Sequence, residues 1–198
     1  MKRQISRLVP ILAILALTTA CMTPPGDTVA SQRQTVHDMR RDTLSKLYKI
    51  RPGTRAIIRR AAGYGVFSNV NVNLVFLSVG AGWGIVRDNR TGKNTYMKMG
   101  SAGIGIGLGV KDFRGIFVFT TRSAMRQFVE SGWNGSAQAD AAAKTGKQGG
   151  ALAGAIDVAP GIKLYQITEH GLALQATIQG TKFWKDDELN LVSARRTR

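Results

Sequence analysis

The sequence predicts a single α+β domain in which a mostly antiparallel, glycine-rich sheet, coiled or closed like a barrel, is combined with about three helices. The chain has 198 residues, of which 43% are hydrophobic and 20% charged, a composition typical of one globular domain. From Gly63 onward the hydrophobic spacing changes from helical to alternating. Strands and helices do not alternate, which disfavours a doubly wound parallel sheet.

Three segments carry helical signals. Residues 31–50 have apolar side chains on one stripe, with Ser31 as the expected N-cap, and Arg51, Pro52 and Gly53 end the helix. Residues 55–62 follow, capped by Thr54. The third helix is expected from Thr121 as cap to Ser131, with Gly132 as its stop signal.

The remaining segments carry strand and turn signals. One of them, residues 103–110, alternates glycine and aliphatic residues strictly, so one of its faces has no side chains. We expect that face to be architectural, because it lets another backbone approach or lets the sheet coil sharply. The other expected elements are strands over 64–67, 70–84, 84–86, 94–99, 116–120, 133–144 and 151–158, turns at 88–92 and 111–115, a hairpin of 162–168 with 172–180 that turns at 169–171, and an acidic segment at 184–190.

The N-terminus has the layout of an export signal. Basic residues precede an apolar run that is too short to span a bilayer, and small residues follow before Cys21. Cys21 after small residues resembles the lipobox of bacterial lipoproteins, whose cysteine carries acyl chains such as palmitate, although Thr18 stands where leucine is usual. An ordinary signal peptidase would cut at the same place and leave a free thiol. The expected organisation is a signal peptide over 1–20, a tether over 21–30, a domain over 31–190 and a basic tail over 191–198.

Met22, rather than an aspartate, follows the cysteine. That residue resembles the sorting pattern for the outer membrane, so we expect the periplasmic face of the outer membrane. The inner membrane and the cell surface are the alternatives.

The net charge of +16 predicts an anionic partner. Export argues against nucleic acid, which leaves an anionic phospholipid membrane as the leading expectation. Residues 31–60 hold nine Lys and Arg against two Asp. The alternatives are that these charges are solvated faces of structural helices, or that they meet an acidic polymer; Arg87, Arg90 and Lys93 are the fallback contact. The residues expected to bind lipid headgroups are Arg40, Arg41, Lys46, Lys49, Arg55, Arg59 and Arg60.

Nothing in the sequence supports enzymatic chemistry, a cofactor or a metal site. The glycine run lacks the spacing of a phosphate-binding loop. The acids Asp186, Asp187 and Glu188 are interpreted as a solvated loop rather than a cation site. His37 and His170 are interpreted as surface residues, because neither has a neighbouring nucleophile or the spacing of a metal ligand.

Several of these segments, in this order, resemble the SYLF domain, a lipid-binding module. The resemblance covers roughly residues 48–190. It is carried by the segments 60–67 (RAAGYGVF), 82–86 (GWGIV), the glycine-alternating strand, 116–120 (IFVFT), 124–128 (AMRQF), 164–174 and 180–183 (GTKF).

The resemblance implies that the domain binds lipids. Eukaryotic members of the family bind phosphoinositides, in part through a basic amphipathic N-terminal helix, and some bundle actin. Bacterial members look like lipoproteins. Two hypotheses follow: an envelope lipoprotein that binds anionic lipid headgroups, or a structural lipoprotein that docks an envelope protein or acidic polymer through its basic face.

Overall fold

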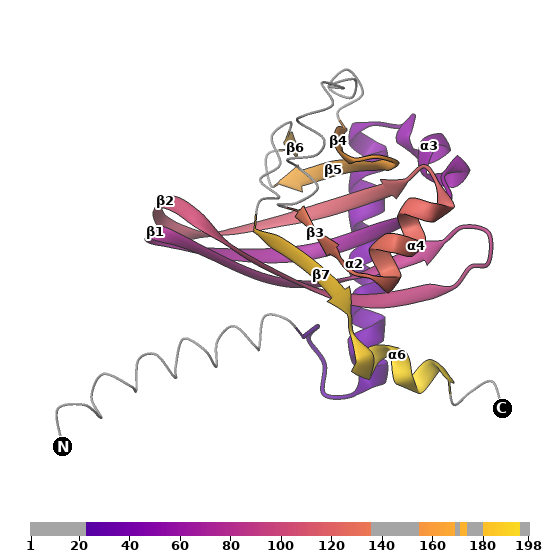
Figure 1. Ribbon diagram of the computed structural model, residues 1–198, viewed down its shortest axis with the longest axis horizontal. Coiled ribbons are helices and arrows are strands. Elements are labelled where there is room, and N and C mark those ends of the chain that lie inside the picture. The colour runs from indigo at the N-terminus through magenta and orange to yellow at the C-terminus, as the bar shows by residue number, and fades with distance from the viewer. Residues whose placement is uncertain (1–22, 136–154, 169–170, 174–179, 195–198) are drawn as a thin grey trace.

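The computed structural model describes residues 23–135, 155–168, 171–173 and 180–194 (Figure 1). Within these ranges helices and antiparallel strands form one α+β unit, which confirms the predicted fold class. The helices are α2 (Val29–Ile50), α3 (Thr54–Arg60), α4 (Arg122–Glu130) and α6 (Asp187–Ala194). The strands are β1 (Gly63–Asp88), β2 (Asn94–Phe119), β3 (Trp133–Asn134), β4 (Ile156–Ala159), β5 (Ile162–Thr168), β6 (Gly171–Ala173) and β7 (Thr181–Lys185).

Strand β2 is the centre of the sheet. It pairs with β1 from Asn94 to Phe119, and its other edge pairs with β7 at one end and with β5 at the other. Strand β3 extends the sheet beyond β7, while β4 and β6 extend it beyond β5. The antiparallel pairing of β5 with β6 agrees with the start of the expected hairpin of 162–168 with 172–180, although Gly171 already belongs to the strand; residues 169–170 and 174–179 lie outside the described residues.

The predicted turn at 111–115 is wrong, because β2 continues through it. Lys111 pairs with Asn71, and Gly115 pairs with Phe67. Asp112 and Gly115 favour a turn locally, but β1 supplies a pairing partner at every position there, and the ladder overrides the local preference. For the same reason the three strands expected over 64–67, 70–84 and 84–86 are one strand.

The long β1–β2 ribbon is bent back on itself. It runs out to one side of the molecule and returns (Figure 1). The two halves of β1 then lie against each other so closely that a Cβ atom on Gly82 would lie 2.1 Å from the Ser68 carbonyl oxygen. A Cβ on Gly84 would lie 2.3 Å from the Val66 oxygen. Glycine is therefore required at positions 82 and 84, where the two halves of β1 pack against each other.

The glycine-alternating segment 103–110 lies in β2, as predicted for a strand. Its backbone pairs with the outer part of β1, for example Leu108 with Leu74 and Gly103 with Ser78. What would surround side chains at Gly105 and Gly107 lies outside the described residues, so their architectural role stays a prediction.

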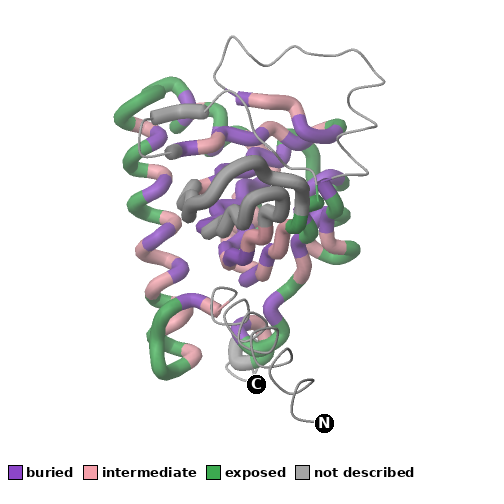
Figure 2. The backbone as a smooth tube through the Cα atoms, turned by 90° about the vertical axis from the view of Figure 1, so that its left-hand side faces the viewer, coloured by how far each residue is buried: buried purple, intermediate pink, exposed green. Residues whose placement is uncertain are grey.

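The sheet has a hydrophobic core on each face. Phe67, Phe117 and Phe119 point toward α4 and pack with Phe128, Trp133 and Phe183. The alternate residues Val66, Ile116 and Val118 point to the other face, where they meet Val36, Met39 and Leu47 of α2. Figure 2 shows α2 lying along the sheet with buried residues toward it. The alternation of neighbouring strand residues thus separates a layer that contains α2 from a layer that contains α4.

The helix starts differ from the prediction in two places. The N-cap of α2 is Thr28 instead of Ser31: the Thr28 side chain accepts a hydrogen bond from the Ser31 N–H, and the Ser31 side chain accepts one from the Thr28 N–H. The N-cap position of α3 is Gly53, while the Thr54 hydroxyl donates to the Arg51 carbonyl. The Thr121 cap of α4 and the stop at Gly132, with φ +71°, are confirmed.

Part of the expected tether folds onto α2. The Thr35 hydroxyl donates to the Pro25 carbonyl at 2.9 Å, and the Gln32 amide donates to the Gly26 carbonyl at 3.0 Å. The folded domain therefore includes residues before the expected boundary at residue 31. Of the expected basic tail, residues 191–194 belong to α6 and residues 195–198 lie outside the described part of the chain.

Candidate functional site

Two of the expected headgroup residues are engaged elsewhere. The Arg40 guanidinium donates to the Asn94 side chain at 3.1 Å and is half-buried. Arg41 forms an ion pair with Asp38, one helical turn earlier, at 2.9 Å. The structure therefore separates Arg40 and Arg41 from the other five residues, which lie toward the C-terminal end of α2 and on α3.

Those five, together with Arg51, surround the connection between α2 and α3. Lys46 and Lys49 come from the last turns of α2, and α3 contributes its three arginines. All are exposed, and none forms an ion pair with another described residue. We call this surface the α2–α3 corner; its cations are Lys46, Lys49, Arg51, Arg55, Arg59 and Arg60.

Arg55 lies over the ring of Tyr48, 4.5 Å from its centroid. Burial raises the pKa of the Tyr48 hydroxyl, and the nearby Arg55 charge opposes that rise in part. The contact stacks the first arginine of α3 on the last turn of α2 and so links the two helices across the corner.

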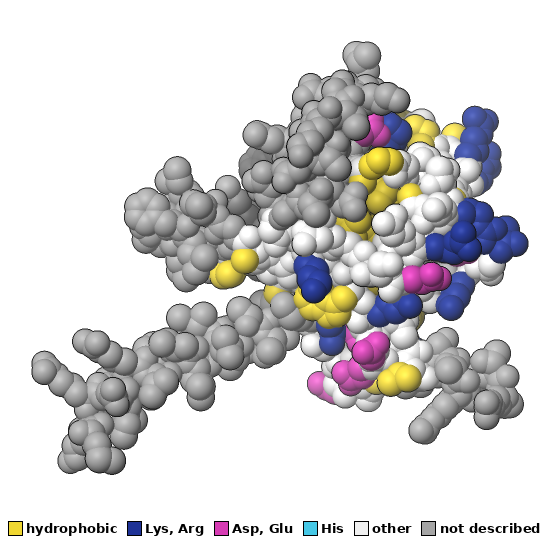
Figure 3. All heavy atoms as spheres, in the orientation of Figure 1, with side chains coloured by type: hydrophobic (Ala, Val, Ile, Leu, Met, Phe, Trp, Pro, Cys, Tyr) yellow, Lys and Arg dark blue, Asp and Glu magenta, His cyan; other side chains and the backbone are white. Residues whose placement is uncertain are grey.

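The turn between β1 and β2 is docked against the end of α3. The Asn89 amide donates to the carbonyls of Ile58 at 2.7 Å and Ala61 at 3.0 Å. On its other side the turn meets α4, where Arg122 pairs with Asp88 at 3.9 Å. Figure 3 shows Lys and Arg side chains gathered over α3, α4 and this turn. We call this surface the basic end; it adds Arg90, Lys93, Arg122 and Arg126 to the arginines of α3.

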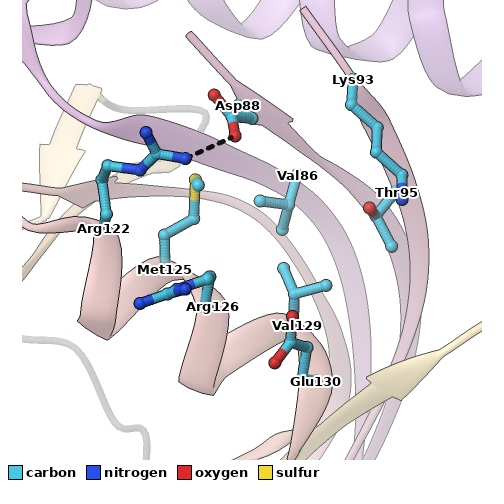
Figure 4. Close-up of a pocket in the computed structure, with 9 residues that line it drawn as sticks. All are labelled: Val86, Asp88, Lys93, Thr95, Arg122, Met125, Arg126, Val129 and Glu130. Atoms are coloured by element: carbon cyan, nitrogen blue, oxygen red, sulfur yellow. Dashed lines mark ion pairs between the residues drawn. The ribbon is translucent and has the colours of Figure 1, made fainter. Parts of the chain in front are cut away.

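A hollow of about 180 Å³ lies between the turn and α4 (Figure 4). Val86, Met125 and Val129 form its apolar part. Its polar rim carries three cations and two carboxylates, namely Lys93, Arg122, Arg126, Asp88 and Glu130. The hollow is therefore a small, mixed-charge depression within the basic end.

Asp88 is held in its ionised form at this rim. Burial alone would raise the pKa of its carboxyl, but hydrogen bonds from the Thr91 and Arg90 N–H groups outweigh it and lower the pKa. Asp88 thus shapes the turn and orients Arg122, while the other cations of the basic end have no described carboxylate within ion-pair distance.

Sequence reasoning missed Arg122 and Arg126. They are one helical turn apart on α4, at positions that the predicted helix already places on one face. Their spacing of four residues could therefore have identified them as a pair of cations on one helix face. What the sequence alone could not supply was that the turn contacts α3 through Asn89 and α4 through Asp88, which brings all three to the same end of the domain.

The interpretation of His37 as a surface residue is wrong. Its Nε2 lies 3.0 Å from the Tyr96 hydroxyl of β2, and both side chains are partly buried. The neighbouring Arg33 lies over the Tyr96 ring and donates from Nε to the Leu189 carbonyl at 2.9 Å. These contacts fix the N-terminal half of α2 against β2 and α6. His170 lies outside the described residues.

We expect His37 to make the stability of the domain dependent on pH. Burial, followed by the charge of Arg40, lowers its pKa below the ordinary value of 6.5; Arg87 and Arg33 act in the same direction, and Asp38 opposes them. The unfolded chain therefore binds more protons than the folded one in the range just below pH 6.5. We expect the free energy of unfolding to fall as the pH drops from about 7.5 to about 5.5.

Urea unfolding at these two pH values measures this slope. His37→Gln keeps a partner for the Tyr96 hydroxyl but does not titrate, so its slope should be smaller. Equal slopes in the wild type and His37→Gln would show that other groups control this range.

The acidic segment is also placed differently from the expected solvated loop. Asp186 is only 2% exposed, pairs with Lys98 at 3.4 Å, and accepts a hydrogen bond from the Leu189 N–H at the start of α6. Asp187 and Glu188 are exposed in the first turn of that helix. In the described ranges no group of His, Cys, Asp and Glu side chains has the arrangement of a metal site.

Cys21 and the signal segment lie outside the described residues. Over residues 23–135, and in the shorter ranges after them, no helix has the length and apolarity needed to span a membrane.

The chain is similar in sequence to one bacterial protein over most of its length. Over 166 residues, 84% of this chain, it is 32% identical to Beta cell expansion factor A of Aeromonas veronii. The matched region spans 62% of that protein's length, so the relative has a substantial part with no counterpart in this match. No family model matches the chain. Over most of its length, the chain thus resembles a bacterial protein that is longer than the matched region.

Proposed function

We propose that this protein is a cell-envelope lipoprotein of the SYLF type, whose domain binds anionic phospholipid headgroups through the α2–α3 corner and the basic end. The observation that carries the proposal is the gathering of exposed cations from α2, α3, the β1–β2 turn and α4 on adjoining surfaces. Each Lys or Arg near an anionic leaflet contributes about 1 kcal/mol of attraction.

The proposed anchor and the α2–α3 corner lie at opposite ends of α2. The helix has 22 residues, which corresponds to a length of about 33 Å. Because Pro25 and Gly26 are bonded to α2, the distance from Cys21 to Pro25 can be at most about 14 Å. If the anchor and the α2–α3 corner contact the same leaflet, α2 must therefore lie at a shallow angle to the membrane. Under the proposal, the lipid and the corner together set the orientation of the domain.

Flotation with vesicles tests the binding directly. The mature chain, residues 21–198, carries Cys21→Ser so that no acyl chain contributes. We expect it to float with vesicles containing phosphatidylglycerol, more strongly as the anionic fraction rises and less strongly as salt increases. Absence of flotation at low salt would overturn the proposal and favour docking to an envelope protein or an acidic polymer.

Lipidation gives a separate prediction. Protein extracted from membranes should begin at Cys21 and carry the mass of acyl chains on that residue, which mass spectrometry of the N-terminal peptide measures. Under this proposal the acylated protein fractionates with the outer membrane and faces the periplasm. A soluble protein that begins with an unmodified Cys21 would contradict the lipoprotein assignment.

A further inference from the structure

We propose that the α2–α3 corner inserts two isoleucine side chains, Ile50 and Ile57, among the acyl chains of an anionic bilayer. The inference rests on the proposed function and deepens it, because it names a bilayer interface, rather than a soluble polyanion, as the ligand of this surface. It is argued from the exposure of the isoleucines, the cations that flank them in sequence, and the backbone hydrogen bonds made within the corner.

Exposed apolar residues are concentrated at this corner. Among the described residues the exposed large hydrophobic side chains are Ile50 (43%), Ile57 (41%) and Leu191 (68%). The two isoleucines stand on either side of residues 51–53, which join α2 to α3. Pro52 is also exposed, and a Cβ on Gly53 would meet nothing within 4 Å. The tip of the corner is therefore open and partly apolar.

The cations of the corner flank these side chains in sequence. Lys49 and Arg51 flank Ile50, and Arg55 and Arg59 lie two residues on either side of Ile57. An apolar surface bordered by Lys and Arg is the pattern of segments that lie in the membrane interface, with cations at the headgroups and apolar groups below them. A soluble polyanion would meet the cations but would gain nothing from the isoleucines.

Part of the corner backbone is hydrogen-bonded within the chain. The Arg51 N–H donates to the Leu47 carbonyl at 2.8 Å, the Thr54 N–H to the Arg51 carbonyl at 3.0 Å, and the Arg55 N–H to the Pro52 carbonyl at 3.3 Å. Unpaired backbone groups are costly near lipid chains, so these bonds lower the cost of bringing the turn into the interface. Tyr48, which lies beneath Arg55, is a residue type that favours the interface.

Leu191 provides a matched control within the same chain. It is more exposed than either isoleucine, and the exposed acids Asp187 and Glu188 precede it in its own helix, while Arg195, Arg196 and Arg198 follow it in sequence. An anionic leaflet should therefore attract that helix less than the α2–α3 corner, whose six cations have no described carboxylate within ion-pair distance. Exposure alone predicts that Leu191 inserts at least as well as Ile57, whereas the corner argument predicts that only Ile57 does.

The experiment uses the mature chain with Cys21→Ser, which leaves it without cysteine, and a single new cysteine at either Ile57→Cys or Leu191→Cys. Each protein is labelled with an environment-sensitive fluorophore and mixed with phosphatidylglycerol–phosphatidylcholine vesicles. We expect a blue shift and higher intensity at position 57 and no change at position 191. Polyglutamate added instead of vesicles should cause no shift at either position.

Unlabelled variants give a second, independent measurement. Ile50→Ser with Ile57→Ser should weaken vesicle binding about tenfold or more, because each isoleucine no longer transfers its exposed apolar surface from water. Leu191→Ser should bind like the parent protein. Circular dichroism confirms that all variants are folded.

The outcomes separate the inference from the function on which it rests. Flotation of the parent protein with no spectral shift at position 57, and with equal binding by the double serine variant, would overturn insertion and leave headgroup binding standing. Failure of the parent protein to float with any vesicle would overturn both, because insertion requires binding. A shift at both labelled positions would show that the fluorophore, not the corner, drives insertion, and would also overturn the inference.

Discussion

Gly84→Ala is expected to lower the free energy of unfolding by about 3 kcal/mol or more, at the upper end of the cost of overpacking. The added methyl group would lie 2.3 Å from the Val66 carbonyl oxygen and 2.4 Å from a ring carbon of Phe67. The oxygen belongs to the backbone of the same sheet, and the ring packs among Phe117, Phe128 and Phe183, so neither neighbour can move away freely. For a protein of this size the melting temperature should fall by roughly 6–12 °C.

Gly115→Ala is the matched control. Gly115 is also buried in the sheet, but its nearest neighbours would lie 3.6 Å from the new methyl group, at ordinary contact distance. Since alanine loses less entropy than glycine on folding, this variant should be neutral or gain up to about 1 kcal/mol. Thermal unfolding by circular dichroism compares the two. Equal melting temperatures would show that the halves of β1 are less closely packed than the structure has them.

The contrast between these glycines shows what local pattern can and cannot predict. Alternation from Gly63 onward predicted the strands, and the Thr121 and Gly132 signals predicted both ends of α4, because each depends on neighbours within a few residues. The folding of β1 back on itself depends on contacts between distant residues, because it brings Gly84 against Val66, eighteen positions away. The turn expected at 111–115 failed for the same reason, since its partner residues 67–71 precede it by forty to forty-eight positions.

The same limit applies to the candidate site: local spacing predicted some of its residues, and contacts distant in sequence decided the others. A count of charges along residues 31–60 led to the α2–α3 corner, because helix spacing alone places Arg55 and Arg59 on one face. The same count could not distinguish them from Arg40, which bonds to Asn94, or from Arg41, which is paired with Asp38. Asp186 behaves similarly: the acidic run indicated a solvated loop, but Lys98, eighty-eight positions earlier, gives it a buried partner.

Reversal of Arg55, Arg59 and Arg60 to glutamate is expected to abolish most vesicle binding at low ionic strength. The change is six units of charge on exposed positions of one short helix, and at about 1 kcal/mol per cation the attraction falls by several kcal/mol. The cost to folding should be small. Arg55 loses its contact with Tyr48, about 0.5–1 kcal/mol at an exposed site. The other two lose a favourable interaction with the helix C-terminus, each about 0.3–1 kcal/mol.

Two further variants show whether the effect follows position or only total charge. The triple glutamine variant changes three units at the same positions and should lose about half as much binding free energy. Lys182→Glu with Lys185→Glu changes four units on exposed positions of β7, outside the basic end, and should lose less than the triple glutamine variant. Flotation measures binding, and circular dichroism confirms folding. A folded triple glutamate variant that still binds like the wild type would move the contact from α3 to Arg90, Lys93, Arg122 and Arg126, because these cations share the basic end and are untouched by the change.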